Sequence, residues 1–462
     1  MKRWLLVALL GLLAVAGGTY RQRISRVLFA HAHPADPARE LFRVTLPAWQ
    51  TARVRPWSTA GGPAALELLH AAHAWPSLAE ALHGLDEAWP DDAKVRAAVK
   101  TANQVLRADD LPYFLDVQTI KDQPIVLSYE LRARVPWRIG ARSVEVLRLR
   151  RLDTMNVELA LFGETDHGLP MVLLDRIEAS LARELPVVFG YGDGQEGWQR
   201  NDFDLAALAR LRSLLQARAG AAVVAAALQL HQRDTLLEAM RARFHGGRVH
   251  LNTPDGFVLG EPWLRNMADF ARLDRPGGPL ILDTDLRSVA RADETLRSGA
   301  TAQALEATVD LMALSTEAHE ARHALDDGES DAGSIRPPPP ALFAGMEHSE
   351  FQFIGLADRE LRAYLGELHD SPAPACLSLA KMLRALFGQG ARRNPHFYAT
   401  WTILHQLDPA ADRKPIDALN RLCDLPDGEL RQRAATVWQK LYLTPLIPGV
   451  RGPFGAEPSG GI

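Results

Sequence analysis

The amino-acid sequence predicts an α+β fold that is mostly helical. Two observations predict it. Beyond residue 200, apolar residues recur at helical spacing over long stretches, whereas residues 111–162 alternate apolar and polar side chains as strands do. With 47% hydrophobic and 23% charged residues, the 462-residue chain resembles an ordinary globular protein with a sizeable core. This length corresponds to about two or three domains.

Residues 1–20 are predicted to be a signal peptide or an N-terminal membrane anchor. Lys2 and Arg3 precede an apolar run, and residues 14–16 match the small-x-small rule for signal-peptidase cleavage. Arginines at 21, 23 and 26 follow, and such positive charge disfavours export of the chain behind it. A cleaved signal, an anchor with an exported domain and an anchor with a cytoplasmic domain therefore compete. We favour the anchored, exported form, which places the chain in the cell envelope on the periplasmic side.

The region 21–110 is predicted to be helical. Pro76 and Pro90 separate three helices, which the apolar spacing places at 64–73, 78–85 and 91–106.

A β-rich region is predicted over 111–200, with strands at 113–117, 125–135 and 144–152. The Gly-rich turn at 190–197 lacks the Lys-Ser/Thr ending of a P-loop, so we expect no phosphate site there.

The region 201–452 is predicted to be helical again. Apart from the segments discussed below, helices are expected at 203–244, 376–387, 396–407 and 429–441. Residues 453–462 are rich in Gly and Pro and are expected to form a disordered tail. Cys376 and Cys423 either form a disulfide, if the chain is exported, or remain buried thiols.

The most informative motif is His319-Glu320-Ala321-Arg322-His323, an HExxH sequence. It lies in a stretch without Gly or Pro, which begins after Gly299 and which Gly328 is expected to end. Apolar residues cover several faces of this helix, which predicts that it is largely buried. Buried histidines need partners, and positions i and i+4 lie on one face of a helix. A metal ion held by both imidazoles satisfies them.

Zinc is the metal that this motif favours. Glu320 lies beside the expected Zn2+ site, and its carboxylate is placed to take a proton from zinc-bound water, whose pKa the metal lowers. This combination of residue types is suited to the hydrolysis of an amide.

The third ligand is expected from a later helix. The pattern HExxHxxGxxH would need Gly at 326 and His at 329, but Asp326 and Glu329 occupy these positions, so the metzincin arrangement is excluded. Glutamates after His323 are therefore the candidates, and they stand at 329, 347, 350, 360 and 367. Glu360 is our choice because residues 356–368 have helical apolar spacing, and Glu367, seven residues on and on the same face, is the runner-up.

On these residues the chain resembles the gluzincin group of zinc metallopeptidases, which combine HExxH with a downstream Glu in an ExxA setting. The matching residues are His319, Glu320, His323, Glu360 and Ala363. The resemblance spans roughly residues 300–370. It implies a zincin-like metallopeptidase core, with zinc ligands at His319, His323 and Glu360 and a general base at Glu320.

The chain departs from that group in three places. Glu317 and Arg322 are charged where such peptidases usually carry uncharged residues, and Tyr364 stands where several families have Asp. These departures weaken any assignment to a single family.

Other residues are candidates for supporting roles. Hydrolysis needs a donor that stabilises the oxyanion, for which we consider Tyr364, His396 and Tyr398. Asp326 or Asp327 is a candidate for orienting a ligand histidine. The acidic segment that follows, up to Arg336, is expected to be a solvated linker, with a lid over the site as the alternative.

The sequence therefore predicts a zinc metallopeptidase of the cell envelope that acts on a protein or peptide and contacts the membrane through its N-terminal segment. A net charge of −4 argues against nucleic acid as a partner. The alternative is a non-catalytic, membrane-anchored scaffold or binding protein in which the HExxH helix is structural. Hydrolysis of a non-peptide amide is a third possibility.

Overall fold

The computed structural model describes the chain from residue 36 to residue 452, with internal gaps. The described residues are 36–54, 61–120, 123–153, 163–166, 169–178, 181, 205–246, 283–296, 298–330, 351–387, 394–412 and 415–452. The predictions for residues 1–20, 190–197 and 453–462 lie outside these ranges. Among the described residues, none of the helices has the length and apolar composition needed to cross a membrane.

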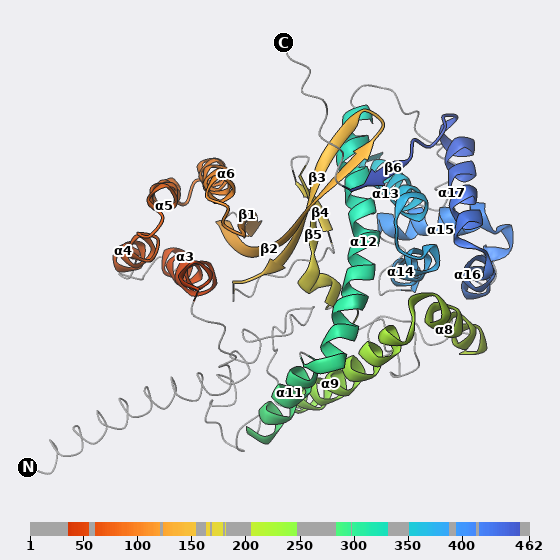
Figure 1. Ribbon diagram of the computed structural model, residues 1–462, viewed down its shortest axis with the longest axis horizontal. Helices are drawn as coiled ribbons and strands as arrows, with labels where there is room; N and C mark the ends of the chain where they lie inside the picture. The colour runs from red at the N-terminus through yellow and green to blue at the C-terminus, as the bar shows by residue number, and fades with distance from the viewer. Residues whose placement is uncertain are drawn as a thin grey trace, which may run out of the picture.

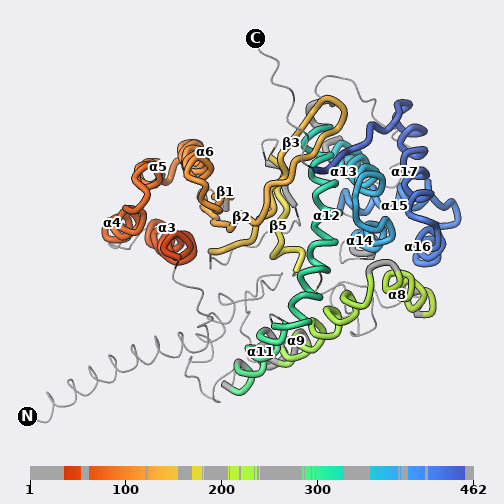
Figure 2. Tube along the Cα trace, in the orientation of Figure 1, coloured from red at the N-terminus to blue at the C-terminus, as the bar shows by residue number. Residues whose placement is uncertain are grey.

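The fold is α+β and mostly helical, as predicted (Figure 1). A mixed sheet lies between a small group of N-terminal helices and a larger group of C-terminal helices, and α12 runs along the boundary between the sheet and the larger group. Figure 2 shows the N-terminal helices α3 to α6, coloured red to orange, and the blue helices α16 and α17 on opposite sides of α12.

The N-terminal group confirms the helices predicted for this region. Asp91 begins the last of them, where its side chain accepts a hydrogen bond from the backbone N–H of Lys94. A short π-helix, Leu41–Thr45, precedes α3. The α-helices are α2 (Pro37–Glu40), α3 (Leu46–Val54), α4 (Gly61–Ala71), α5 (Pro76–Ala88) and α6 (Asp92–Ala108).

The sheet contains the three predicted strands; the first two extend beyond the predicted bounds, and the third begins two residues earlier and ends one residue earlier than predicted. Its order is β1-β2-β3-β5-β4, with β6 paired to the far end of β2. The pair β3–β5 is parallel and the other pairs are antiparallel. The strands are β1 (Tyr113–Ile120), β2 (Gln123–Ile139), β3 (Arg142–Arg151), β4 (Gly163–Asp166), β5 (Leu169–Leu173) and β6 (Gly449–Arg451).

The C-terminal group differs from the prediction in three respects. The stretch 203–244, expected to be helical, consists of two helices, because Gly220 takes a φ of +87° that interrupts the helical path. The helices α11 and α16 were not predicted individually. The group consists of α8 (Leu205–Ala219), α9 (Ala221–Gly246), α11 (Asp283–Leu296), α12 (Gly299–Ser330), α13 (Phe351–Asp370), α14 (Ala375–Phe387), α15 (Pro395–Leu407), α16 (Pro415–Asp424) and α17 (Asp427–Tyr442).

The helix that carries HExxH is longer than predicted. It continues past Gly328 to Ser330, so Gly328 does not end it, and the segment expected to be a linker from Asp326 begins inside the helix. Residues 331–336, the rest of that segment, lie outside the described ranges.

Among the described residues, a small hydrophobic cluster around Leu127 and Leu149 lies within the sheet, and two larger cores join the sheet to the helices. One joins the N-terminal helices to β1, with Phe42, Trp49 and Leu68 fully buried in it. The other crosses the predicted boundary at residue 200, because Val146 and Val172 of the sheet pack in the same cluster as α12 and the helices after it. The sheet and the C-terminal helices therefore share one core.

The cysteines form a disulfide, which decides between the two alternatives left open by the sequence. Cys376 of α14 is bonded to Cys423 of α16, and both residues are buried in the larger core.

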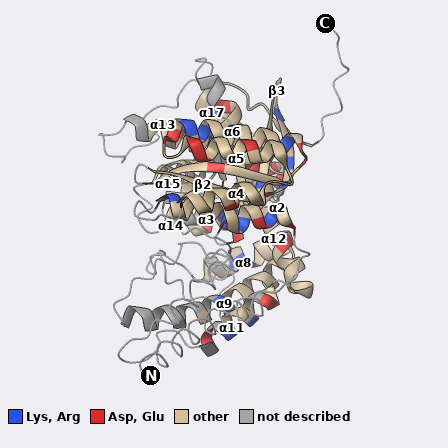
Figure 3. Ribbon diagram, turned by 90° about the vertical axis from the view of Figure 1, so that its left-hand side faces the viewer, with Lys and Arg blue, Asp and Glu red and all other residues tan. Residues whose placement is uncertain are grey.

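The lower helices are seen best in Figure 3, where α9 and α11 lie side by side in a layer below the sheet and the N-terminal helices. Blue and red segments alternate over the visible helices of the molecule, so acidic and basic residues are interspersed there.

Candidate metal centre

The motif helix α12 is buried on several sides, as its apolar pattern predicts. It contacts β3, β4 and β5 on one side and α13 and α14 on the other. All residues from Ser315 to His323 are buried. Its polar residues therefore need protein partners, and those partners explain the departures from the peptidase pattern.

Glu317 attaches α12 to the sheet. Its side chain is fully buried, and it forms ion pairs with Arg148 of β3 and with Arg451 of β6. A charged residue is accommodated here because two guanidinium groups balance it.

Arg322 attaches α12 to α13 and to the C-terminal segment. Its guanidinium donates to a carboxylate oxygen of Asp370 and to the backbone oxygen of Ile447, 3.0 Å away, and it lies 5.4 Å from the Trp438 ring. Gly366 makes this possible, because a Cβ atom at that position would lie 2.6 Å from Arg322 Nε. The close approach of the two helices therefore depends on Gly366 as well as on Ala363, which is fully buried.

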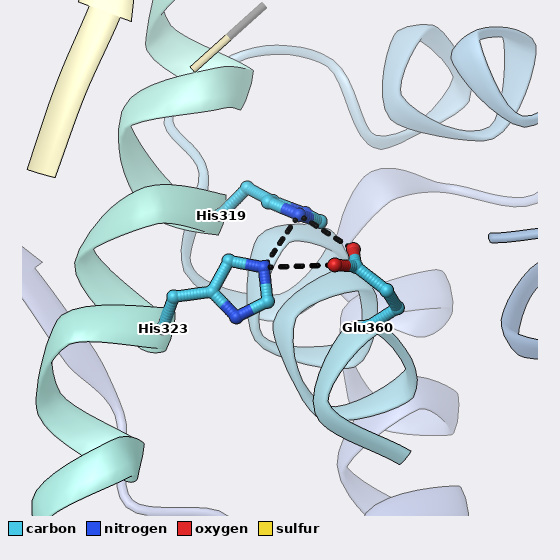
Figure 4. A group of neighbouring side chains, drawn as sticks. All are labelled: His319, His323 and Glu360. Carbon is cyan, nitrogen blue, oxygen red and sulfur yellow. Dashed lines mark hydrogen bonds and ion pairs between the residues drawn. The ribbon is translucent and has the colours of Figure 1, made fainter. Parts of the chain in front are cut away.

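The two histidines of the motif point toward Glu360 on α13 (Figure 4). His319 Nε2 lies 3.2 Å from Glu360 Oε2, and His323 Nε2 lies 3.5 Å from Glu360 Oε1. The two Nε2 atoms are 3.1 Å apart. Three metal-ligating side chains from two helices thus meet at one point, as the sequence predicted for this set of residues.

These separations suit a zinc ion. Ligand atoms at about 2.0–2.1 Å from a tetrahedral zinc lie about 3.3–3.4 Å from one another. Of the described residues, His319, His323 and Glu360 are the group able to hold a metal ion, with all candidate ligand atoms within 4.8 Å of one another. Two imidazoles and a carboxylate also leave a fourth position open, as a catalytic zinc requires.

Glu367, the runner-up ligand, has a different place. Its carboxylate lies 3.2 Å from Nδ1 of His319, on the side of the ring away from Glu360. Lys381 of α14 donates to the same carboxylate at 3.0 Å, and Ser315 donates to it as well. A carboxylate that accepts the Nδ1 proton leaves Nε2 with a lone pair for a metal. Glu367 is therefore placed to orient His319, on the side of the ring away from the group that could hold a metal ion.

Glu367 lies where an orienting carboxylate was considered for Asp326 or Asp327. Asp326 lies 3.7 Å from the guanidinium of Arg322. The side chain of Asp327 lies outside the described part of the chain, as do Glu347 and Glu350 and the side chain of Glu329.

The electrostatics of the site favour a cation. Burial opposes ionisation of Glu360, but the neighbouring His323 and a hydrogen bond with His319 hold its pKa well below the usual range. Burial likewise opposes ionisation of Glu367, yet Lys381 and His319 lower its pKa to about 2. Burial disfavours the charged form of His319, while its hydrogen bonds with Glu360 and Glu367 raise its pKa to about 10. The buried carboxylate of Glu367 and the half-buried carboxylate of Glu360 therefore attract positive charge to this point.

His323 has a different neighbour on the outer side of its ring. Arg359, next to Glu360 in α13, donates from Nε to His323 Nδ1 at 3.2 Å. Arginine has donors only. The two candidate ligand histidines therefore contact groups of opposite hydrogen-bonding character: a carboxylate at His319 and a guanidinium donor at His323.

Of the oxyanion-donor candidates, the structure brings Tyr364 and His396 to the site. His396 Nδ1 lies 3.1 Å from Glu360 Oε2 and 3.1 Å from the hydroxyl of Tyr364. The Tyr364 ring packs edge-on against His319, with the ring centroids 4.6 Å apart. Tyr398 lies on α15 with His396, but its ring packs against Phe397.

Glu320, the expected general base, lies in α12 directly after His319 and is buried. Its negative charge is one of those acting on the His319 ring.

Sequence reasoning missed Lys381 and Arg359, and it considered Glu367 only as the runner-up ligand. Glu367 was detectable as a carboxylate two helical turns from Glu360, on the same face. No local signal marks Lys381, because it reaches the site from another helix.

No family model matches this chain, and no curated protein or solved structure shows significant similarity to it. The geometry of the centre therefore carries the functional argument by itself.

Proposed function

We propose that this protein is a zinc-dependent metallopeptidase of the cell envelope, with a zincin-like core of the gluzincin type. The observation that carries the proposal is the convergence of His319, His323 and Glu360, whose ligand atoms are 3.1–3.5 Å apart. Two imidazoles and one carboxylate form a donor set typical of catalytic zinc. A buried carboxylate behind His319 adds the support that such ligands usually have.

The chain's own residues take separate roles in hydrolysis. When bound, zinc supplies Lewis acidity and lowers the pKa of water. Glu320 accepts the proton of the attacking water and passes it to the leaving amine. His396 and Tyr364 lie beside Glu360 and serve as donors to the carbonyl oxygen as negative charge develops on it. The side chain of His396 is 27% exposed, so a substrate can reach it from solvent.

The disulfide between Cys376 and Cys423 supports an oxidising compartment. This agrees with the exported form that we favour from the N-terminal sequence, with a protein or peptide as substrate.

The first experiment measures zinc by elemental analysis of the purified full-length chain. We expect about one zinc per chain, lost in His323→Ala and in Glu360→Ala. His369→Ala is a matched control, because His369 is also paired with a carboxylate, that of Asp370, yet lies outside the centre. A folded wild-type chain that takes up no zinc when it is supplied contradicts the proposal.

The second experiment separates catalysis from binding. Glu320→Gln keeps the shape of the side chain but removes the base. We expect peptide hydrolysis to fall by at least about a hundredfold while zinc content and melting temperature stay unchanged. A Glu320→Gln variant as active as the wild type contradicts the role of Glu320.

One observation favours the alternative, a non-catalytic envelope scaffold with a structural HExxH helix. The ring nitrogens of His319 and His323 all lie within 3.2 Å of polar protein atoms, so hydrogen bonds alone can satisfy them. In that case His323→Ala would lower stability, and zinc would not raise the melting temperature of the wild type.

A further inference from the structure

We propose that Arg359 restrains metal loading at this centre by a hydrogen bond that excludes a metal from His323. The inference rests on the proposed metal site but concerns a residue outside its ligand set. Arg359 is half-buried on α13, and its Nε atom is 3.2 Å from Nδ1 of His323.

The exclusion follows from hydrogen-bond chemistry. Arg359 Nε carries a hydrogen and cannot accept one, so His323 Nδ1 must present its lone pair to it. A neutral imidazole has one hydrogen, which must then be on Nε2. Nε2 is the atom that faces Glu360 and His319, and a nitrogen that carries a hydrogen has no lone pair for a metal. The bond from Arg359 and a metal at His323 Nε2 therefore exclude each other.

The neighbouring ligand has no such conflict. Glu367 accepts a hydrogen from Nδ1 of His319, and Nε2 of His319 lies 3.2 Å from the Glu360 carboxylate. A metal that replaces the hydrogen on Nε2 leaves the Nδ1–Glu367 hydrogen bond intact. Of the two histidines, only His319 has an acceptor on the outer side of its ring.

Metal binding therefore requires one defined change. The Arg359–His323 hydrogen bond breaks, and the His323 hydrogen moves from Nε2 to Nδ1, with no change in the charge of the ring. Arg359 sets the free energy of this step, and it also places a positive charge near an incoming dication. Replacing Arg359 should tighten metal binding, which is the opposite of what replacing a supporting residue does.

Two variants separate the hydrogen bond from the charge. Both Arg359→Met and Arg359→Gln remove the positive charge. Met offers no strong hydrogen-bonding group, whereas the amide oxygen of Gln can accept the Nδ1 hydrogen that a metal-bound His323 must carry. Arg421→Gln is the control, because Arg421 is paired with Asp408 on the surface.

The test is a competition titration with Zn2+ and a chromophoric chelator, using the full-length chain after removal of bound metal. We expect the affinity for zinc to rise in the order wild type, Arg359→Met, Arg359→Gln, with Gln about tenfold or more above wild type. Arg421→Gln should match the wild type. A wild type that binds zinc only weakly beside a Gln variant that binds one equivalent tightly also supports the proposal.

Two results overturn it while leaving the metal site in place. In the first, all three chains bind one zinc with equal affinity. In the second, Met and Gln variants gain equally, so that charge alone acts. If neither the wild type nor the variants bind zinc although their melting curves show them folded, the metal site fails and this inference fails with it.

A spectroscopic readout tests the step directly. Imidazole 15N chemical shifts, with the His323 signals assigned by their loss in His323→Asn, report which ring nitrogen carries the hydrogen. Before zinc is added, His323 should carry it on Nε2 in the wild type, and added zinc should move it to Nδ1. Finding it on Nδ1 before zinc is added would contradict the proposal.

Discussion

The N-terminal helices and α12 differ in the kind of side chains that they bury. Among the described residues of 36–110, Gln50 is the one buried polar side chain, and its amide oxygen accepts the backbone N–H of Val126 at 2.6 Å. Along α12, buried polar and charged residues are frequent, and they are Thr308, Ser315, Thr316, Glu317, His319, Glu320, Arg322, His323 and Asp326.

The difference shows where the chain departs from the usual rule that cores are apolar. An apolar core gains stability from removing hydrocarbon surface from water. A buried charge has a desolvation cost that only close partners offset. The buried charges concentrated on α12 therefore have two roles. Glu317 and Arg322 attach the helix to the sheet and to α13, and His319 and His323 belong to the candidate metal centre.

The largest expected effect comes from removing an anchor of α12. Glu317→Ala leaves the guanidinium groups of Arg148 and Arg451 without their buried partner. We expect the free energy of unfolding to fall by about 3–5 kcal/mol in urea titrations. Glu306→Ala, at an exposed position of the same helix, should change it by less than about 0.5 kcal/mol. Equal effects would show that burial of Glu317 does not matter.

In the apolar core of the N-terminal helices, a substitution should change stability through packing alone. Leu68 is fully buried among the N-terminal helices, and Leu68→Ala should lower the free energy of unfolding by about 2–5 kcal/mol because it leaves a cavity. Zinc affinity should be unchanged, since Leu68 belongs to the N-terminal core and the candidate metal centre lies beside the C-terminal one. A loss of zinc together with stability would mean that the two cores unfold as one unit.

Zinc should stabilise only a chain with an intact centre. At a free concentration one hundred times Kd, bound zinc adds about 2.7 kcal/mol to the free energy of unfolding. Calorimetry should show a higher melting temperature for the wild type with zinc and no shift for His323→Ala. A shift of the same size in both would place zinc elsewhere.

A pair of glycines on α13 tests the close approach of the two helices. Gly366→Ala brings a methyl group against Arg322, and we expect a loss of about 1–3 kcal/mol. At Gly355 an added Cβ meets nothing within 4 Å, so Gly355→Ala should stabilise the helix by up to about 1 kcal/mol. Urea titration of both variants measures these changes in the free energy of unfolding. A loss of equal size in each would show that the helices do not depend on Gly366 for their close approach.

The smallest effect is expected at Asp175, a fully buried carboxyl that follows β5. Burial raises its pKa in the folded chain, although Arg151 opposes the shift. A raised folded pKa means that the folded chain holds this proton more tightly than the unfolded chain does. The contribution of the group to stability is therefore greatest below the unfolded pKa and declines as pH rises through the folded value.

Asp175→Asn removes this dependence. The variant should gain stability relative to the wild type as pH rises from acid to neutral, as unfolding curves at pH 3, 5 and 7 would show. A difference that does not vary with pH would contradict the raised pKa.

The helical periodicity of residues 300–330 and 351–370 was readable from the sequence because it depends on local spacing. Since a helix repeats every 3.6 residues, the shared face of His319 and His323 followed from their numbers. Glu360 was chosen by its helix and its neighbours, and the structure brings it to the two histidines. Gly220 was not recognised as a break, because the helical pattern continues on both sides of it.

The contacts of Glu367 and Arg359 with the two histidines could not be predicted from local spacing in the sequence. Whether a carboxylate seven residues after Glu360 binds the metal or faces Nδ1 of His319 depends on how α12 and α13 cross. That crossing is set by Gly366, Arg322 and the C-terminal segment.

The sequence by itself determined the helical and β-rich regions, the identity of the metal-ligating residue types and their common helix face. These follow from local backbone geometry and side-chain chemistry. The tertiary structure decided the disulfide, the shared core of sheet and helices, and which group touches each ring nitrogen of His319 and His323. Hydrogen bonds of about 3 Å between helices distant in sequence depend on packing over the whole core, and no local pattern encodes such a distance.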